Sequence, residues 1–187
     1  MKVIAGKAKG RKLKCKKGLS TRPMTSRIKK MVFDIISKKL TEADILDLYA
    51  GSGSLGIEAL SRGGRKAIFI EKDYIAANFL KQNLINTSFH DISKVMTLDV
   101  VKSIDILANK SLKFDILFCD PPYNIDEIKI RSILKKINKS KLLKIGGMLI
   151  YHHSKRISFS GISIGMNLIK RIKTGESVVS FYQYSYK

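Results

Sequence analysis

Hydrophobic residues recur along most of this chain with the periods of helices and strands. Residues 21–40 carry apolar side chains at helical spacing, and Thr25 or Ser26 can cap a helix that begins just after Pro23. From residue 43 onward, compact apolar runs alternate with amphipathic stretches. They predict strands at 43–50, 66–71, 92–99, 114–120 and 146–153, and helices at 54–62, 73–86, 101–109 and 125–140.

Strands that are apolar almost throughout and that alternate with helices are typical of a parallel sheet covered on both faces. Residues 167–185 differ, because they predict two strands joined at Thr174 and Gly175, an antiparallel hairpin. The predicted fold is therefore α/β and Rossmann-like, a mostly parallel sheet that ends in an antiparallel C-terminal hairpin.

The first 24 residues differ from the rest in composition. Residues 2–18 place lysines and arginines around short apolar pairs and two glycines, which predicts a strand, a turn and a second strand. They hold too little apolar material for a core of their own. We therefore divide the chain into a basic N-terminal arm or hairpin, 1–24, and a main domain, 25–187.

The charge of the chain indicates a polyanionic partner. The sequence has 187 residues, 44% of them hydrophobic, and its 36 Lys and Arg against 15 Asp and Glu give a formal net charge of +21. Such a domain is attracted to nucleic acid, although part of the lysine excess can be compositional. The exposed cations of the arm are the first candidates for RNA contact: Lys7, Lys9, Arg11 and Lys12.

Several classes of protein do not fit this sequence. No segment approaches the ~20 apolar residues of a membrane span, and the N-terminus lacks the apolar middle of a secretory signal. Cys15 and Cys119 make neither a disulfide framework nor a zinc site, and the three histidines form no ligand set. A catalytic role for His152 and His153, which end a strand, is the less favoured interpretation. We expect a cytoplasmic, monomeric protein without a metal.

A glycine-rich loop follows the predicted strand 43–50. Gly51, Gly53 and Gly56 fit the pattern G-x-G-x-x-G between a strand and a helix, where glycines allow a sharp turn and close approach to a ligand. Glu71 ends the next strand, where an acid can accept hydrogen bonds from ribose hydroxyls. These features alone are compatible with a dinucleotide cofactor such as NAD, and so with a dehydrogenase.

Two further acids favour a cationic cofactor. Asp47 precedes the glycines and would repel a pyrophosphate, and Asp99 ends the third strand. A ligand with an amino group, a sulfonium and an adenosine suits such acids, and S-adenosylmethionine has all three. Asp47 would lie near its amine, Glu71 near the ribose and Asp99 near the adenine. For Asp99, a helix N-cap is an equally good explanation. The other candidates for cofactor binding adjoin these positions: Tyr49, Ala50, Ser52, Lys72 and Val100.

The stretch DPPY, Asp120 to Tyr123, follows the predicted strand 114–120. The exocyclic amine of a base is a poor nucleophile, because its lone pair is delocalised into the ring. A carboxylate and a backbone carbonyl can accept its two N–H bonds, and Pro121 and Pro122 stiffen such a turn. Tyr123 can stack on the base. The alternative is a proline turn with a core tyrosine.

The pairing of DLYAGSGSLG with DPPY resembles the class I S-adenosylmethionine-dependent methyltransferases that modify exocyclic amines. With AGKAKGRKLK, TRPMTSR and GESVVSFYQY added, the sequence resembles, essentially end to end, the RsmD family of bacterial 16S ribosomal RNA guanine-N2 methyltransferases. That resemblance implies a seven-stranded sheet and methylation of one guanine N2 in 16S rRNA, within an assembling 30S subunit. It also implies that Arg22 and Arg27 lie near the mouth of the site.

The sequence departs from the family pattern at Met24, where Thr is usual, and at Lys29 and Lys30, where Arg and Glu are usual. Two alternatives to the proposed reaction remain. An adenine-N6 methyltransferase of DNA or RNA shares both motifs, but the chain has too few spare residues for a region that reads base edges. A non-catalytic RNA-binding assembly factor would keep the fold, and the intact DPPY stretch argues against it.

Overall fold

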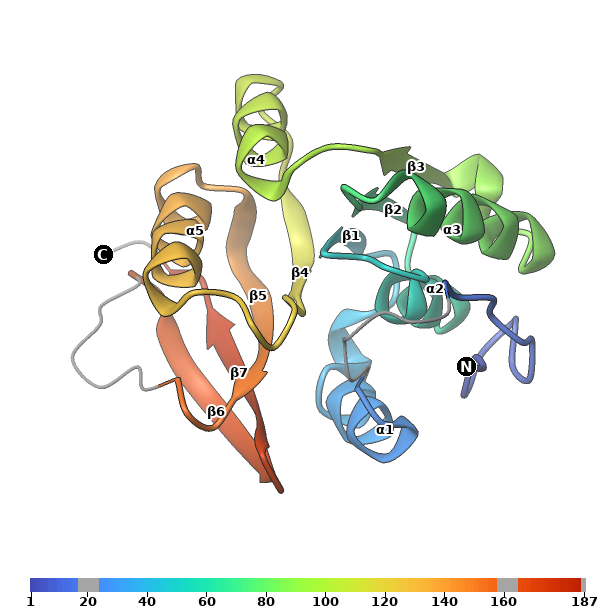
Figure 1. Ribbon diagram of the computed structural model, residues 1–187, viewed down its shortest axis with the longest axis horizontal. Coiled ribbons are helices and arrows are strands. Elements are labelled where there is room, and N and C mark those ends of the chain that lie inside the picture. The colour runs from blue at the N-terminus through green and yellow to red at the C-terminus, as the bar shows by residue number, and fades with distance from the viewer. Residues whose placement is uncertain (17–23, 158–164, 186–187) are drawn as a thin grey trace.

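The computed structural model describes residues 1–16, 24–157 and 165–185. Its helices are α1 (Ser26–Ile35), α2 (Ser54–Ser61), α3 (Tyr74–Asn86), α4 (Val100–Asn109) and α5 (Glu127–Lys139), with short 3-10 helices η1 (Ser37–Lys39) and η2 (His90–Ile92). Its strands are β1 (Asp44–Leu48), β2 (Lys66–Ile70), β3 (Ser93–Met96), β4 (Phe114–Cys119), β5 (Leu143–Ser154), β6 (Asn167–Thr174) and β7 (Ser177–Gln183) (Figure 1). The predicted alternation of strands and helices is confirmed.

The seven strands form one sheet in the order β3-β2-β1-β4-β5-β7-β6. Strands β1 to β5 pair in parallel, whereas β7 pairs antiparallel with both β5 and β6. The C-terminal hairpin is therefore present, with its second strand inserted beside β5. The chain runs outward from β1 through β2 and β3, then returns to the other side of β1 with β4, so the strand order reverses between β1 and β4. Ligands of open α/β sheets bind at such a point.

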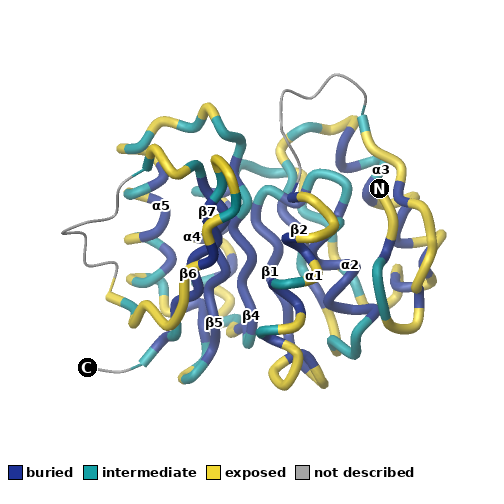
Figure 2. The backbone as a smooth tube through the Cα atoms, turned by 90° about the horizontal axis from the view of Figure 1, so that it is seen from below, coloured by how far each residue is buried: buried dark blue, intermediate teal, exposed yellow. Residues whose placement is uncertain are grey.

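Helices cover both faces of the sheet (Figures 1 and 2). The side chains of each inner strand alternate between the faces, and they divide the core into two clusters. One cluster packs Ile45, Phe69 and Phe118 beneath α1, α2 and α3. The other packs Leu46, Ile70 and Leu117 beneath α4 and α5. None of the helices in the described ranges is long and apolar enough to cross a bilayer.

The first helix covers the apolar positions that predict it, and its C-cap is Ile36. The Thr25 hydroxyl accepts a hydrogen bond from the Ile28 amide, so Thr25 is the N-cap. The α-helix ends at Ile35, and η1 carries the chain on to Leu40. The Ser37 hydroxyl donates to the Asp34 carbonyl at 2.9 Å, a local bond of the kind that competes with helix propagation. Apolar spacing continues past the α-helix because Ile36 and Leu40, which flank η1 and lie four residues apart, are both buried.

The N-terminal segment differs from the predicted hairpin. Lys2 and Lys12 form a single antiparallel bridge, and no regular strand forms among residues 1–16. The Val3 and Leu13 amides donate across the segment to the carbonyls of Arg11 and Met1, at 3.0 and 2.9 Å. The amides of Ile4 and Ala5 donate instead to the Glu58 carboxylate at 2.7 and 3.0 Å. The apolar side chains of the segment enter the core beneath α1 to α3: Val3, Ala8 and Leu13. The segment is therefore an irregular hairpin, and side chains of α2 and α3 bind several of the amides that its own backbone leaves.

Candidate active site

The reversal of strand order places the two sequence motifs side by side. Leu48, the last residue of β1, pairs with Cys119, the last residue of β4. The glycine loop that follows β1 and the DPPY loop that follows β4 therefore open onto one cavity of about 750 Å³. All predicted cofactor and catalytic residues except Gly53 line this cavity: Asp47, Tyr49, Ala50, Gly51, Ser52, Glu71, Lys72, Asp99, Val100, Asp120, Pro121, Pro122 and Tyr123.

Glu71 holds the glycine loop from the end of β2. One carboxylate oxygen accepts the Gly51 amide and the other accepts the Asp73 amide, both at 2.8 Å. Gly51 and Gly53 have φ of +54° and +80°, which side chains rarely adopt, and Gly53 N-caps α2. A Cβ added at Gly51 would meet no atom within 4 Å, so the backbone there faces open space. The loop is therefore a preformed turn with room for a ligand against it.

Gly56 and Asp47 fix the packing beneath that loop. A Cβ at Gly56 would lie 2.3 Å from Cε1 of Phe69 and 3.1 Å from Oδ2 of Asp47, so only glycine fits. The same Asp47 oxygen accepts the Gly56 amide at 2.9 Å. Burial raises the pKa of Asp47 to about 8, and the charges of Asp120 and Glu71 act in the same direction. Asp47 is thus a largely protonated acid at the floor of the cavity.

The cavity is acidic although the protein is strongly basic. Only three lysines line it, against six of the fifteen acids of the sequence. The six acids are Asp47, Glu71, Asp73, Asp99, Asp120 and Asp126. Asp99 also accepts the Val101 amide at 2.8 Å and is the N-cap of α4, as the alternative interpretation of this residue predicted. The concentration of carboxylates suits a cationic ligand and is unfavourable to a pyrophosphate.

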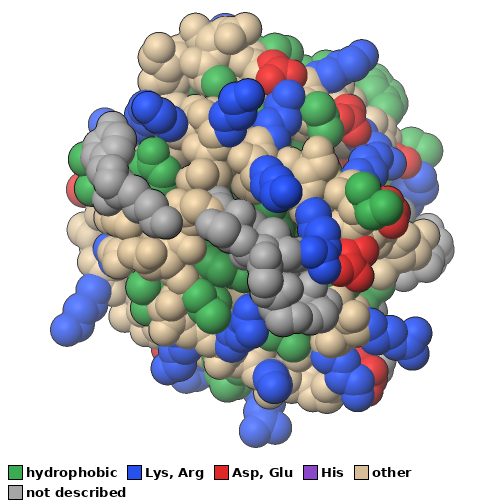
Figure 3. All heavy atoms as spheres, turned by 90° about the vertical axis from the view of Figure 1, so that its left-hand side faces the viewer, with side chains coloured by type: hydrophobic (Ala, Val, Ile, Leu, Met, Phe, Trp, Pro, Cys, Tyr) green, Lys and Arg blue, Asp and Glu red, His purple; other side chains and the backbone are tan. Residues whose placement is uncertain are grey.

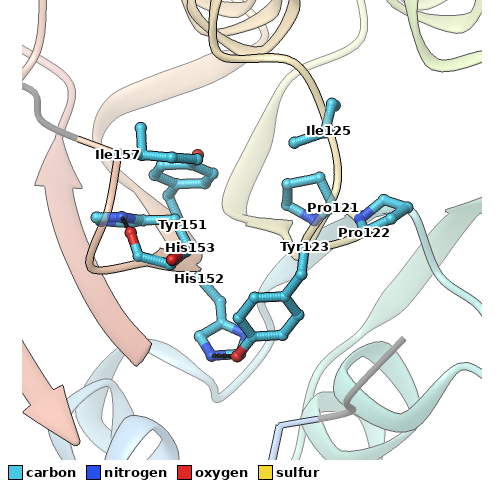
Figure 4. Close-up of a pocket in the computed structure, with 9 residues that line it drawn as sticks. Pro121, Pro122, Tyr123, Ile125, Tyr151, His152, His153 and Ile157 are labelled. Atoms are coloured by element: carbon cyan, nitrogen blue, oxygen red, sulfur yellow. Dashed lines mark hydrogen bonds between the residues drawn. The ribbon is translucent and has the colours of Figure 1, made fainter. Parts of the chain in front are cut away.

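Hydrogen bonds within the DPPY loop, and to residues of β5 and β7, fix its position. The Ile125 amide donates to the Pro122 carbonyl at 3.0 Å and closes the turn. The Tyr123 hydroxyl lies 2.5 Å from the Ser177 hydroxyl and 3.3 Å from Nε2 of His152. Nδ1 of His152 in turn lies 2.7 Å from Oδ1 of Asp120. In Figure 4, Tyr123 and His152 lie with their rings close together, below the two prolines.

His152 is the residue that the sequence interpretation undervalued. Its imidazole is buried, 2% exposed, and links Asp120 to Tyr123. The available signal was a histidine at the end of a predicted strand next to the DPPY strand in the sheet. Nothing in the sequence showed toward which face its side chain points.

A second cavity of about 650 Å³ adjoins the first. It lies between the start of α1, the end of β5 and the turn joining β6 to β7, and it shares Met24 and Tyr123 with the larger cavity. Arg27 and Arg156 line it. Arg27 thus lines the second cavity and not the larger one, and Arg22 lies outside the described residues.

The other cations predicted to contact RNA are exposed. Lys7, Lys9, Arg11 and Lys12 all lie on the surface of the N-terminal segment. Figure 3 shows a further surface, on the side of α5 and β6, where Lys and Arg side chains outnumber acidic ones. Both of these surfaces are therefore cationic, in contrast to the acidic lining of the cavity.

Lys29, one of the departures from the family pattern, has a structural role. Its ammonium is buried, 3.2 Å from Oε2 of Glu58, and donates to the Lys2 carbonyl and the Ser54 hydroxyl. Burial lowers the pKa of Lys29, and the nearby Glu58 carboxylate opposes that shift. Glu58 also pairs with Arg62 at 2.8 Å. This ion-pair cluster joins α1, α2 and the N-terminal segment.

The cysteines and histidines do not form a metal site in the described ranges. Cys119 is buried in the sheet, and burial raises the pKa of its thiol, so it is a packed side chain and not a nucleophile. His153 points to the opposite face from His152, stacks on Tyr151 and contacts the Ser180 hydroxyl, and burial lowers its pKa to about 4.

The fold and the position of the site define the class of protein. A seven-stranded sheet with an antiparallel final strand, and a cavity at the ends of β1 and β4, are the arrangement of the α/β methyltransferases. The solved structure described as "Putative methyltransferase yhhF from Escherichia coli" matches with a TM-score of 0.85 and 26% identity, over 100% of this chain and 99% of that chain.

Residues 1–183 match the family described as "Conserved hypothetical protein 95", and the chain belongs to this family, the RsmD family that its motifs resemble. The Bacillus subtilis (strain 168) protein named "Putative rRNA methyltransferase YlbH" is 33% identical over 183 residues, 98% of each chain. "Ribosomal RNA small subunit methyltransferase D" of Haemophilus influenzae is 35% identical over 130 residues, 67% of this chain and 65% of the relative.

Proposed function

We propose that this protein transfers a methyl group from S-adenosylmethionine to the exocyclic N2 amine of a guanine in 16S ribosomal RNA. The observation that carries the proposal is the meeting of the glycine loop and the DPPY loop at one cavity. The first loop provides a cofactor cradle and the second a site for a planar amine, so donor and acceptor groups can approach each other there. The names of the relatives support the choice of small-subunit rRNA as substrate.

The residues of the cavity fit S-adenosylmethionine, which supplies an electrophilic methyl group bound to sulfur. Asp47 would hold the amino group of the methionine moiety, and Glu71 would hold the ribose hydroxyls. Glu71 already accepts two amides, yet a carboxylate has about four acceptor sites and retains capacity for a hydroxyl. Asp99 would accept from the adenine amine beside Val100, and Gly51 leaves room for close approach.

The DPPY loop would hold the guanine. Asp120 and a carbonyl of the proline turn would accept the two N–H bonds of the amine and make its nitrogen more nucleophilic. The Tyr123 hydroxyl is held by Ser177, so its ring is set in one orientation for stacking against the base. Positioning and oriented dipoles would supply most of the acceleration. The methylated amine is acidic enough to lose its proton to Asp120 or to water, and this chain's residues need no metal for that step.

The surface would hold the surrounding RNA. Arg27 and Arg156 at the second cavity, with the exposed cations of residues 1–16, can contact phosphates on either side of the target nucleotide. We propose that the substrate is an assembling 30S subunit and that the protein acts as a monomer in the cytoplasm. Residues 1–24 would act as a basic arm of the domain formed by 25–187.

The test is methyl transfer from labelled S-adenosylmethionine to unmodified small-subunit particles, to protein-free 16S rRNA and to DNA, followed by mass spectrometry of the nucleosides. N2-methylguanosine from the particles or the RNA is the expected product. N6-methyladenine in DNA or RNA would show that the assigned substrate is wrong and that the assigned cofactor is right. Cofactor binding without transfer to any substrate would favour a non-catalytic assembly factor.

A further inference from the structure

We propose that His152 is a positioning residue for methyl transfer, one that sets the orientation of the Asp120 carboxylate and of the Tyr123 ring together. The inference rests on the proposed function, because it assigns a role within the same site. His152 itself lines the second cavity and not the cofactor cavity. It would therefore act through Asp120 and Tyr123, without touching the cofactor.

With a neutral His152 ring, the protons along this chain of groups have one consistent arrangement. An ionised Asp120 only accepts, so Nδ1 of His152 carries the proton and donates to Oδ1 at 2.7 Å. Nε2 then accepts from the Tyr123 hydroxyl at 3.3 Å, and the Tyr123 oxygen accepts from the Ser177 hydroxyl at 2.5 Å. Every group has a partner, and Oδ2 of Asp120 is left to accept an N–H of the guanine amine.

The sheet makes this arrangement rigid. His152 lies within β5, where it pairs with Val179 of β7, and its side chain is 2% exposed. Asp120 and Tyr123, in contrast, lie in a loop after β4, and the Asp120 side chain is 23% exposed. A buried strand residue therefore holds two loop residues by opposite sides of one imidazole ring. A carboxylate without this bond would rotate about its Cβ–Cγ axis and lose its aim at the amine.

The size of the effect follows from the geometry of attack. A displacement of about 1 Å in a positioning group can cost about 100-fold in rate. Loss of the His152–Asp120 bond should therefore lower kcat by about 10- to 100-fold. The KM for S-adenosylmethionine should change little, because His152 lies outside the cofactor cavity.

Two substitutions separate the two hydrogen bonds of the ring. In His152→Asn the amide NH₂ can take the place of Nδ1 and still donate to Asp120. In His152→Gln the amide reaches the place of Nε2 and leaves Asp120 without its donor. His153→Asn is the matched control, since His153 is an adjacent buried histidine whose partners are Tyr151 and Ser180 on the other face.

The experiment measures kcat and KM of the full-length wild type and the three variants, with labelled S-adenosylmethionine and unmodified small-subunit particles. Thermal unfolding identifies any variant that fails to fold. We expect His152→Gln to lose 10- to 100-fold in kcat at unchanged cofactor KM, and His152→Asn and His153→Asn to stay within about threefold of the wild type.

Two results would overturn parts of this account separately. A folded His152→Gln variant with wild-type kcat, beside an active wild type, removes the positioning role and leaves the methyltransferase assignment intact. A wild type that binds cofactor but methylates no guanine removes the proposed function, and the role of His152 falls with it. An Nδ1 proton resonance of His152 that persists in Asp120→Ala would also contradict the assigned hydrogen bond.

Discussion

The buried acid Asp47 leads to a prediction that does not depend on the methyl acceptor. Burial and the charges of two neighbouring acids raise its pKa to about 8, so it carries a proton at neutral pH in the ligand-free protein. If the cationic amino group of the cofactor binds beside it, the ionised form is favoured and the proton leaves. Binding of the cofactor should therefore release close to one proton below about pH 7.5.

The magnitude follows from the pKa. Each pH unit below about 8 adds roughly 1.4 kcal/mol to the free energy needed to ionise Asp47. At about pH 6 the penalty is about 3 kcal/mol, which corresponds to about 100-fold weaker binding than at pH 8. The affinity for the cofactor should rise with pH. An acid whose pKa is raised is protonated at neutral pH, and it must lose that proton before it can form an ion pair with the amino group.

Isothermal titration calorimetry with S-adenosylhomocysteine, which carries the same amino group, tests this between about pH 5.5 and about pH 7.5, where that group stays charged. Buffers of different ionisation enthalpy report the number of protons released. Asp47→Asn is the control, because it keeps the shape and cannot titrate. A pH-independent affinity with no proton release, in the wild type, would refute the pairing of Asp47 with the cofactor amine.

Four further predictions follow from the contacts. Gly56→Ala should destabilise the fold by about 2 kcal/mol, since the clash outweighs the gain in helix propensity, as denaturant unfolding would show. Glu58→Gln should cost about 3 to 5 kcal/mol, because it leaves a buried lysine unpaired, and should speed hydrogen exchange in residues 1–16. Asp120→Ala should abolish transfer while calorimetry shows that the cofactor still binds. RNA binding should weaken steeply with salt, and replacing Arg11 and Lys12 by Ala should lower the slope by about 2.

Each of these predictions has a control. Phe69→Leu should relieve the penalty of Gly56→Ala, and an unrelieved penalty would contradict the clash. Asp34→Asn removes an exposed partner of Lys30 and should cost less than about 1 kcal/mol. Loss of cofactor binding in Asp120→Ala would contradict the division of roles between the two loops. Equal affinities at low and moderate salt would exclude phosphate contacts as the main source of RNA binding.

Much of the fold was predictable because its signals are local. The apolar strands between Ala43 and His153 and the amphipathic helices between them were found by periodicity alone, and Thr174 with Gly175 marked the hairpin turn. The end of α1 at Ile35 is not marked by the pattern, because the buried residues Ile36 and Leu40 continue the apolar spacing past it. Periodicity reports which side chains are buried and not which backbone bonds are made.

The N-terminal segment shows the limit of local patterns. Its alternation of lysines with apolar residues predicted a hairpin, and Lys2 does pair with Lys12. Other amides of the segment are bound by the side chains of Glu58, Ser61 and Asn83 from two helices. These partners lie more than 50 residues away along the chain. A pattern that predicts an extended backbone does not say whether a neighbouring strand or a set of side chains will accept the hydrogen bonds of its amides.

The alternating architecture, the basic charge, the glycine loop and the DPPY loop can all be recognised in the sequence, because each depends on composition or on residues close together in the chain. The folded sheet is needed to show that β1 and β4 are neighbours, that six acids share one cavity, and that His152 points at Asp120 and His153 away from it. The direction of a strand side chain depends on the register of the sheet, and a shift of one residue would exchange the two histidines. Register is set by the packing of the whole sheet, which no short stretch of sequence contains.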